Sequence, residues 1–174
     1  MEAVYYSWVP SSIGSIWVAS HRAGVCLVRF GLTEEDFLEV VRTVCEGPHI
    51  PDQEFNRGVT EEIKAYFDGR LTRFSCPLDP QGTPFEMKVW GALQRIPFGE
   101  TRSYQEIAEE VGTPRGCRAV GGANGRNPIP LLIPCHRVIR KNGELGGFAS
   151  GTETKAWLLR FENEISSRHK GRAA

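Results

Sequence analysis

The sequence predicts two domains: a small N-terminal α/β domain with an antiparallel sheet and helices, and a mostly α-helical C-terminal domain with a helix-turn-helix. Near the N-terminus, short runs rich in Val, Ile, Trp and Tyr alternate with turn residues, which is typical of antiparallel strands. In the second half, apolar residues recur at helical spacing, and a tight Gly-Thr turn joins two predicted helices. A proline-rich stretch separates the halves. The predicted boundaries are 1–78 for the N-terminal domain, 79–84 for the connection, 85–165 for the C-terminal domain and 166–174 for a flexible tail.

The N-terminal domain begins with three predicted strands, which cover residues 4–9, 14–20 and 24–30. Thr33 then opens a helix in the manner of a capping box, and Gly47 ends it. The apolar face of this helix, at i, i+3, i+4 and i+7 spacing, consists of Phe37, Val40, Val41 and Val44. A second helix is predicted over residues 59–67, with Ile63 and Phe67 facing inward.

The second half begins with a helix predicted over residues 85–96. Ser103 and Glu106 form a capping box for the next helix, and Gly112 ends it. The buried stripe of that helix consists of Tyr104, Ile107, Ala108 and Val111. A Thr-Pro pair starts the following helix, over residues 115–124, which completes the helix-turn-helix.

This last helix is unusual because Gly121 and Gly122 lie in its centre, where each costs about 1 kcal/mol relative to alanine. Such a smooth face allows a close approach, either to a DNA groove or to a neighbouring helix of the protein. Arg115 and Arg118 favour DNA, as does the surrounding charge, since residues 111–143 hold six basic residues and no acidic ones.

Composition is that of an ordinary soluble protein, with 174 residues, 40% of them hydrophobic and 24% charged, and a formal net charge of zero. No apolar run approaches the roughly 20 residues that cross a bilayer, and the N-terminus lacks the pattern of a secretory signal. Five scattered cysteines without a CxxC pair are typical of a reducing compartment, so we expect a cytoplasmic protein, or a nuclear one in a eukaryote.

The candidate nucleophile is Cys135, which follows a proline-framed apolar run over residues 127–134 and precedes His136. A thiol beside an imidazole on a rigid segment is an arrangement for nucleophilic chemistry. The alternative is a structural cysteine, because free cysteines are often small buried hydrophobes. Glu162, on the last predicted helix, could orient the imidazole as the third member of a triad does.

Between Cys135 and the last helix, Asn142-Gly143 predicts a turn, and the glycines up to Gly151 predict a loop that can lie against a ligand. Ser150 is the expected cap of the last helix, together with Glu153. The inward face of that helix is expected to consist of Leu158, Phe161 and Ile165.

Three motifs bear on function: Arg-Ala-Val-Gly-Gly-Ala at 118–123, Asn-Pro at 127–128 and Ile-Pro-Cys-His-Arg-Val at 133–138. Together with Phe-Gly-Glu at 98–100, Ser-Tyr at 103–104, Gly-Gly-Phe at 146–148 and Lys-Ala-Trp-Leu-Leu at 155–159, they resemble the O6-alkylguanine-DNA alkyltransferases. The resemblance covers about residues 84–163 and is looser in the N-terminal half. It implies an RNase H-like N-terminal domain and a winged-helix-like C-terminal domain.

The resemblance implies direct-reversal DNA repair, in which the Cys135 thiol irreversibly accepts the alkyl group from O6-alkylguanine, or from O4-alkylthymine, once per molecule. His136 would act as a water-mediated base, and Glu162 would complete the hydrogen-bond chain. Tyr104 would donate its hydroxyl to the leaving guanine. Asn127 would tie the recognition helices to the active-site segment.

The resemblance also implies how DNA and substrate are bound. Arg118 would enter the duplex from the minor groove in place of the flipped nucleotide. The further DNA-binding residues are expected to be Arg115, Ala119, Gly121, Gly122, Ala123 and Asn124. The residues expected to hold the alkylguanine are Asn127, Phe148, Ser150, Gly151 and Lys155. The expected partner is double-stranded DNA, bound by a monomer without a cofactor.

The chain departs from the family pattern in two places. Phe148 stands where many members have tyrosine, and Ala149-Ser150-Gly151 replaces a commoner Ser-Gly-Gly, which bears on substrate preference. His21 and Cys26 fall near two ligand positions of a zinc site found in some members, but the other two ligands have no counterpart, so we expect no metal.

Three other functions stay open at this point. A lesion-binding relative without repair activity would lack the cysteine of the motif, whereas Cys135 is present. A helix-turn-helix regulator with a structural cysteine predicts sequence-specific binding without consumption of thiol. A Cys-His hydrolase predicts many turnovers.

Overall fold

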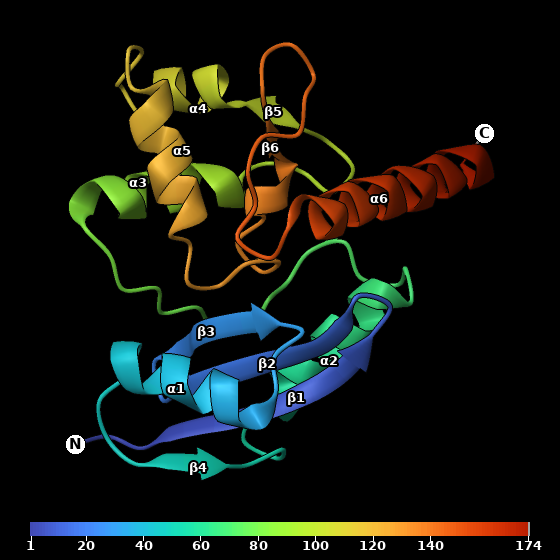
Figure 1. Ribbon diagram of the computed structural model, residues 1–174. Coiled ribbons are helices and arrows are strands. Elements are labelled where there is room, and N and C mark those ends of the chain that lie inside the picture. Colours follow the sequence, from blue (N-terminus) through green and yellow to red (C-terminus); the bar gives the residue numbers. More distant parts are fainter. Residues whose placement is uncertain (174) are drawn as a thin grey trace. The chain divides into compact units, whose positions relative to one another are not determined.

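Alternating apolar residues near the N-terminus form the antiparallel sheet that the sequence predicts. In the computed structural model, which describes residues 1–173, β1 (Val4–Ser11), β2 (Gly14–His21) and β3 (Gly24–Phe30) pair as a meander (Figure 1). A fourth strand, β4 (His49–Pro51), pairs in parallel with β1, which gives the order β3-β2-β1-β4. The sequence did not predict β4, because three residues that end in proline carry no signal of alternation.

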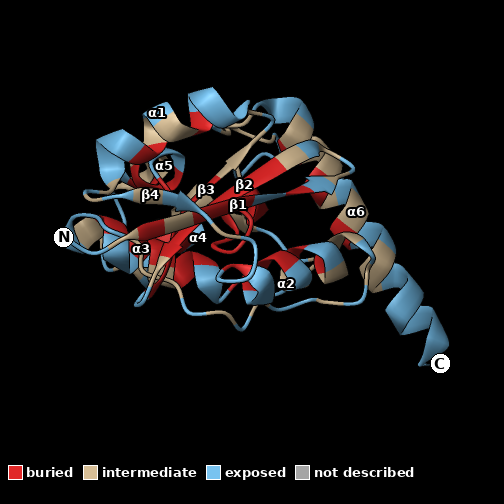
Figure 2. Cartoon of the chain, turned by 90° about the horizontal axis from the view of Figure 1, so that it is seen from below, coloured by how far each residue is buried: buried red, intermediate tan, exposed pale blue. Residues whose placement is uncertain are grey.

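Two helices cover the two faces of this sheet. α1 (Glu34–Val44) lies on one face and α2 (Arg57–Phe67) on the other (Figures 1 and 2). The Thr33 hydroxyl accepts a hydrogen bond from the Asp36 backbone N–H at 3.2 Å and so caps α1. Successive strand residues point to opposite faces, so a strand that is covered on both faces is buried along most of its length, as the central strand β2 and the edge strand β3 are.

The core beneath α1 differs in one position from the predicted apolar face. Its buried members are Val4, Tyr6, Trp17, Ala19, Cys26, Leu27, Phe37 and Val41. Val44, expected to face inward, is 51% exposed, and the next residue, Cys45, packs against this core in its place. The cause is the end of the helix, since Cys45 has an extended backbone that redirects its side chain. On α2, Ile63 is buried as predicted, but Tyr66 is the fully buried aromatic residue and Phe67 only half-buried.

A second unit of the chain begins at Gly82, after a first unit that spans Met1–Gln81. Its helices are α3 (Pro84–Gln94), α4 (Tyr104–Glu110), α5 (Cys117–Gly125) and α6 (Thr152–Arg172). Reciprocal capping boxes begin two of them, formed by Thr83 with Glu86 and by Ser103 with Glu106. The Trp90 indole N–H donates to the Ala123 carbonyl at 2.9 Å, and this bond joins α3 to α5.

Two of the predicted helix starts that differ from the structure lie next to turns. α5 begins at Cys117 rather than at residue 115, because the Gly116 N–H donates to the Thr113 carbonyl at 2.7 Å and closes a turn first. α6 begins after Gly151, whose φ of 93° lies in the left-handed region. Ser150 does not cap α6, because Gly151 holds the N-cap position.

The predicted flexible tail is also wrong for most of its length, because α6 continues as a helix to Arg172. Three basic residues in its last turn, His169, Lys170 and Arg172, favour this extension because cations stabilise the C-terminal end of the helix dipole. This end of α6 is exposed (Figure 2). Ala174, the last residue of the predicted tail, lies outside the described residues.

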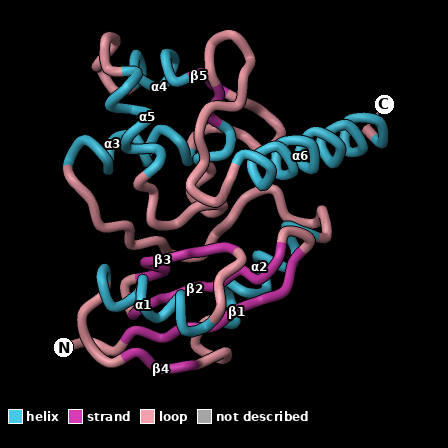
Figure 3. The backbone as a smooth tube through the Cα atoms, in the orientation of Figure 1, coloured by secondary structure: helices cyan, strands magenta, loops and turns pink. Residues whose placement is uncertain are grey.

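The segment between α5 and the nucleophile is a loop, residues 126–134, that ends at the short 3-10 helix η1 (Cys135–Arg137) (Figure 3). After η1, β6 (Val138–Ile139) pairs in parallel with β5 (Arg102–Ser103) and so places the end of this segment beside the start of α4. Within residues 1–173, no helix is long and apolar enough to span a bilayer.

Candidate active site

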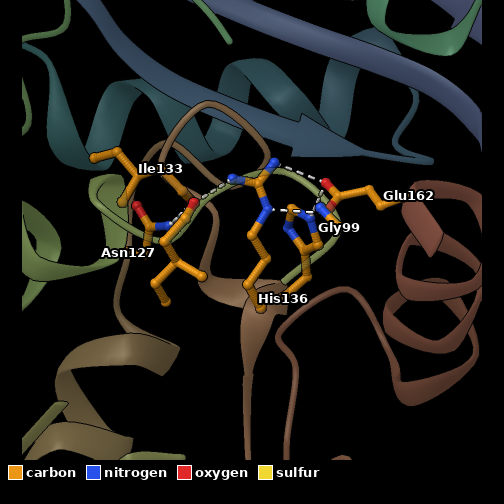
Figure 4. Close-up of polar contacts among 7 residues, drawn as sticks. Gly99, Asn127, Ile133, His136 and Glu162 are labelled. Atoms are coloured by element: carbon orange, nitrogen blue, oxygen red, sulfur yellow. Dashed lines mark hydrogen bonds and ion pairs between the residues drawn. The ribbon is translucent and has the colours of Figure 1, made fainter. Parts of the chain in front are cut away.

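The loop that carries Cys135 is fixed by the side chain of Asn127. Its amide N–H donates to the Ile133 carbonyl at 2.8 Å, and its Oδ1 accepts the Ile129 N–H at 2.9 Å (Figure 4). Leu131, between these two points, is buried and has a φ of 78°, a conformation that a non-glycine residue adopts only under constraint. The loop therefore presents Cys135 from a rigid, buried support.

A second asparagine ties this loop to α5. The Asn124 amide, on the last turn of α5, donates to the carbonyl of Cys135 at 3.3 Å. The predicted link through Asn127 is present as well, because Asn127 lies just after α5 and its side chain bonds Ile133 of the active-site segment. Asn124, which is 4% exposed, thus adds a second connection between α5 and the segment of Cys135, and its contact with DNA stays a prediction.

The Cys135 thiol is only 3% exposed, and its environment sets its reactivity. Burial raises the pKa of Cys135 to about 11, and this rise outweighs the lowering by a hydrogen bond to Asn127 and by the charge of Lys155. The thiol is therefore protonated near neutral pH. An acceptor for its proton is needed before the sulfur can act as a nucleophile.

His136 and Glu162 point toward each other in the buried interior (Figure 4). The Nε2 of His136 lies 2.7 Å from Oε1 of Glu162. Burial lowers the pKa of His136 despite the neighbouring carboxylate, whereas His136 and Arg137 together lower the pKa of Glu162 against the effect of burial. We therefore assign a neutral imidazole that donates from Nε2 to a carboxylate. Its Nδ1 is buried and makes no hydrogen bond to any of residues 1–173, so it is available as a base.

Arg137 belongs to the same buried network, and the sequence analysis did not assign it a role. Its Nε and Nη2 donate to Oε2 and Oε1 of Glu162 at 2.9 and 2.8 Å, and its Nη1 donates to the Ile96 carbonyl at 2.7 Å. The Gly99 backbone N–H completes the set at 3.1 Å (Figure 4). The sequence did hold a signal for this role, since Arg137 follows His136 directly within a mostly apolar stretch. A buried arginine requires a carboxylate partner.

Lys155 is fully buried at the start of α6. Its ammonium donates to the carbonyl of Val138 at 2.5 Å and to that of Gly147 at 3.3 Å, and it lies 5.7 Å from the centre of the Tyr104 ring. Burial lowers the pKa of Lys155 to about 8, although a thiolate at Cys135 opposes this. The residue can thus hold the 138–147 segment in place and also stabilise negative charge.

A cavity of about 430 Å³ lies beside α5, within the range of small-molecule sites. Its lining residues include Tyr104, Arg118, Gly121, Asn124, Gly146 and Phe148. Burial raises the pKa of Tyr104, and nearby Cys135 raises it further, so the phenol keeps its proton and can donate it. A side chain at Gly146 would place its Cβ 2.7 Å from the Tyr104 hydroxyl, so this glycine is needed for the close approach of the loop.

The remaining predicted residues divide between the surface and the interior. Arg118 and Ala119 are exposed on α5, and Arg115 is exposed in the turn before it. Ala123 is fully buried and accepts the Trp90 hydrogen bond, so the prediction that it contacts DNA is wrong. Gly122 lies against the Arg126 side chain. Ser150 and Gly151 precede α6 and do not line the cavity.

His21 and Cys26, the two residues that fall near zinc-ligand positions of some family members, have other partners in the first unit. His21 Nε2 lies 3.1 Å from Oδ2 of Asp79, and the Cys26 sulfur lies 3.4 Å from that of Cys45. Across residues 1–173, no group of three or more His, Cys, Asp or Glu side chains is arranged to hold a metal ion.

Taken together, these features define a two-domain protein in which a helix-turn-helix is followed by a braced loop that carries a buried cysteine. Two family profiles cover nearly the whole chain: "6-O-methylguanine DNA methyltransferase, ribonuclease-like domain" matches residues 4–80, and the DNA binding domain of the same family matches residues 84–164. The chain belongs to the 6-O-methylguanine DNA methyltransferase family.

Individual relatives agree with this assignment. The chain is 44% identical to the methylated-DNA–protein-cysteine methyltransferase of Methanosarcina acetivorans, over 91% of this chain and 98% of that protein. It is 42% identical to the constitutive enzyme of that name from Bacillus subtilis, over 95% and 99% of the two chains. The crystal structure of Mycobacterium tuberculosis OGT in complex with DNA has a TM-score of 0.81 and 40% identity, and it covers 92% of this chain and 94% of that one.

Proposed function

We propose that this protein repairs double-stranded DNA by direct reversal, with Cys135 accepting the alkyl group from O6 of guanine once per protein molecule. The observation that carries the proposal is the buried chain of His136, Glu162 and Arg137, which begins beside Cys135 and leaves Nδ1 of the imidazole available as a base. The relatives bear names that state the same reaction, with methylated DNA as donor and a protein cysteine as acceptor.

The first step is deprotonation of the thiol. Because the pKa of Cys135 is raised to about 11, few molecules hold a thiolate at neutral pH, and a base must take the proton during attack. A water molecule between Sγ and Nδ1 relays this proton to His136. The imidazolium that forms is stabilised by the Glu162 carboxylate, in the way that the acid of a triad acts.

The second step is an in-line displacement at the alkyl carbon. The sulfur forms a new carbon–sulfur bond while the bond between that carbon and O6 breaks, and the electron pair stays on guanine. The Tyr104 phenol, kept protonated by its raised pKa, donates to the departing base. The product is a stable thioether and an intact guanine, and the described site holds no group placed to remove the alkyl group. Each molecule therefore reacts once.

Access to the site requires that the damaged nucleotide leave the duplex. A base in the stack cannot reach Cys135, which is 3% exposed, whereas a flipped base can enter the cavity lined by Tyr104 and by Asn124, the residue that bonds the Cys135 carbonyl. Exposed Arg118 on α5 occupies the place of the flipped nucleotide, and α5 meets the minor groove, where small residues permit close contact. Reduced thiols throughout the chain fit a cytoplasmic site of action.

The test is intact-mass spectrometry of the protein after incubation with excess duplex that contains one O6-methylguanine. We expect a gain of one methyl group, about 14 Da, on no more than one site per molecule, located on the tryptic peptide of residues 127–137. The controls are a duplex with unmodified guanine and the Cys135→Ser variant, which should bind DNA without gaining mass.

Other outcomes assign other functions. An unchanged protein with an unchanged oligonucleotide would indicate a lesion-binding or regulatory protein. An unchanged protein with a demethylated oligonucleotide would indicate repeated turnover, as in a hydrolase, and would overturn the single-use mechanism.

A further inference from the structure

Two cysteines of the first unit lie close enough to react with each other. Cys26 on β3 and Cys45 after α1 are 19 positions apart, and their sulfur atoms are 3.4 Å apart. Both are free thiols. A disulfide bond has a sulfur–sulfur length of about 2.0 Å, so its formation needs an approach of about 1.4 Å.

The two positions differ in access and in freedom to move. Cys26 is 6% exposed, belongs to the core beneath α1, and has its sulfur 3.3 Å from the Ala19 carbonyl. Cys45 is partly exposed and has an extended backbone as the C-cap of α1. A residue at the end of a helix can shift more easily than one inside a strand, so Cys45 is the partner that moves and that meets a reagent first.

Their electrostatic environments assign complementary roles. The hydrogen bond between the two thiols lowers the pKa of Cys45, and the same bond together with burial raises the pKa of Cys26. Cys45 is therefore the thiol that reacts first with an oxidant, and Cys26 is the thiol that then reacts with the oxidised Cys45. The pKa of Cys135 is raised to about 11, and this thiol is buried as well. A small oxidant should consequently react with Cys45 before Cys135.

We propose that Cys26 and Cys45 form a reversible oxidation site, which hydrogen peroxide converts to a disulfide while Cys135 stays reduced. In the first step, the Cys45 thiolate attacks one peroxide oxygen and becomes a sulfenic acid, and the other oxygen leaves as water. In the second step, the Cys26 sulfur attacks the Cys45 sulfur and expels the hydroxyl group as a second water molecule. Both thiol protons end in water, one peroxide is reduced, and an external thiol restores the pair.

The bond would join the third strand to the end of the helix that covers it. By restricting the unfolded chain between residues 26 and 45, it stabilises the first unit. For a loop of this length in a domain of this size, we expect the Tm to rise by on the order of 10 °C. A thiol reductant should reverse the rise.

The test is to expose the reduced protein to one equivalent of hydrogen peroxide, block free thiols with iodoacetamide, and digest the sample without reduction. Trypsin places each cysteine on its own peptide, with ranges 23–29, 43–57, 74–88, 116–118 and 127–137. We expect peptides 23–29 and 43–57 to appear cross-linked, about 2 Da lighter than their sum. Peptide 127–137 should remain blocked by iodoacetamide, which reports a reduced Cys135.

Three variants separate the pair from general oxidation. Cys45→Ser should abolish the cross-link and the rise in Tm, whereas Cys76→Ser, on another free cysteine, should leave both intact. Cys26→Ala should leave a sulfenic acid at Cys45, which a 1,3-diketone probe labels on peptide 43–57. Cys26→Ala removes a buried side chain, which can impair folding. Cys45→Ser changes a partly exposed position, so this variant stays folded and still tests the proposal.

Several results would overturn the proposal. No cross-link at one equivalent of peroxide, or a cross-link that involves a different peptide, would exclude the pair as the site. Oxidation of Cys135 before the cross-link forms would refute the order of reaction. A cross-link that leaves the Tm unchanged would show that the bond does not stabilise the fold.

Discussion

Replacement of Glu162 by glutamine tests the role of the buried carboxylate most directly. Four N–H groups converge on its two oxygen atoms, from His136 Nε2, from Arg137 Nε and Nη2, and from the Gly99 backbone. An amide of the same shape offers one acceptor oxygen and a donating NH2 group, so it must oppose at least one of these donors. The change also removes the negative charge that balances the Arg137 guanidinium.

Two separate losses follow from this change. Leaving one member of a buried ion pair without its partner costs about 3–5 kcal/mol in the free energy of unfolding. Loss of the group that stabilises the imidazolium removes assistance by the base, which we expect to slow methyl transfer roughly 100- to 10,000-fold. Stability is measured by urea unfolding, and transfer by single-turnover kinetics with a duplex that contains O6-methylguanine.

A second variant separates stability from chemistry. Replacing Arg137 by methionine in the Glu162→Gln protein removes the uncompensated charge, so the double variant should regain part of the lost stability. It should not regain the rate, because His136 still lacks a carboxylate. A double variant as fast as the unaltered protein would refute the reasoning, since it would show that Glu162 acts only on the fold. A single variant within about threefold of the normal rate would refute the proposed relay itself.

Three further predictions concern DNA, the loop and pH. Arg118→Ala should slow repair in duplex DNA much more than reaction with free O6-alkylguanine, while Arg160→Ala, at an exposed position of α6, should affect neither; equal slowing of both reactions would exclude a role in flipping. Asn127→Ala removes a hydrogen bond that lowers the pKa of Cys135, so the pH profile of iodoacetamide reaction at this thiol should shift to higher pH; an unchanged profile would contradict that contact. Because the folded-state pKa values of His136 and Glu162 lie below their ordinary values, both contribute stability at high pH that is lost as pH falls, below about 6.5 for His136 and about 4.5 for Glu162. Urea unfolding from pH 8 to 3 should therefore show two successive losses, and the second should be smaller in Glu162→Gln, where only the other carboxyls with lowered pKa contribute.

Periodicity and capping were sufficient to predict the three longer strands and the helices, but not the short strands β4, β5 and β6. Ser103 and Glu106 identified the start of α4 correctly, because a capping box is a local interaction that the sequence displays in full. The start of α5 could not be predicted in this way, since the turn at Thr113 competes with a plausible proline start. Local patterns thus give the type of an element more reliably than its ends.

The site was predictable only where its residues belong to a motif. Cys135 and His136 lie in one contiguous stretch, and Glu162 was a candidate because the last predicted helix supplies a carboxylate that could orient the imidazole. The role of Arg137 depends on Glu162, which lies 25 positions away, and no local pattern specifies that pair. Likewise, Ala123 is buried against Trp90 of another helix. The glycines around Ala123 have no side chains, so the pattern of apolar residues along α5 does not show which face is buried.

The burial of Cys135 also bears on the protein after its reaction. Its sulfur lies in a closely packed interior, 3% exposed, on a loop braced by Asn127 and linked to α5 through Asn124. An added alkyl group must displace neighbouring atoms, and such overpacking commonly costs about 1–3 kcal/mol. The Asn124 hydrogen bond transmits this strain to α5, the helix that we propose binds DNA. The alkylated protein should thus be less stable than the unreacted protein. The larger the transferred alkyl group, the more readily cellular proteases should degrade it.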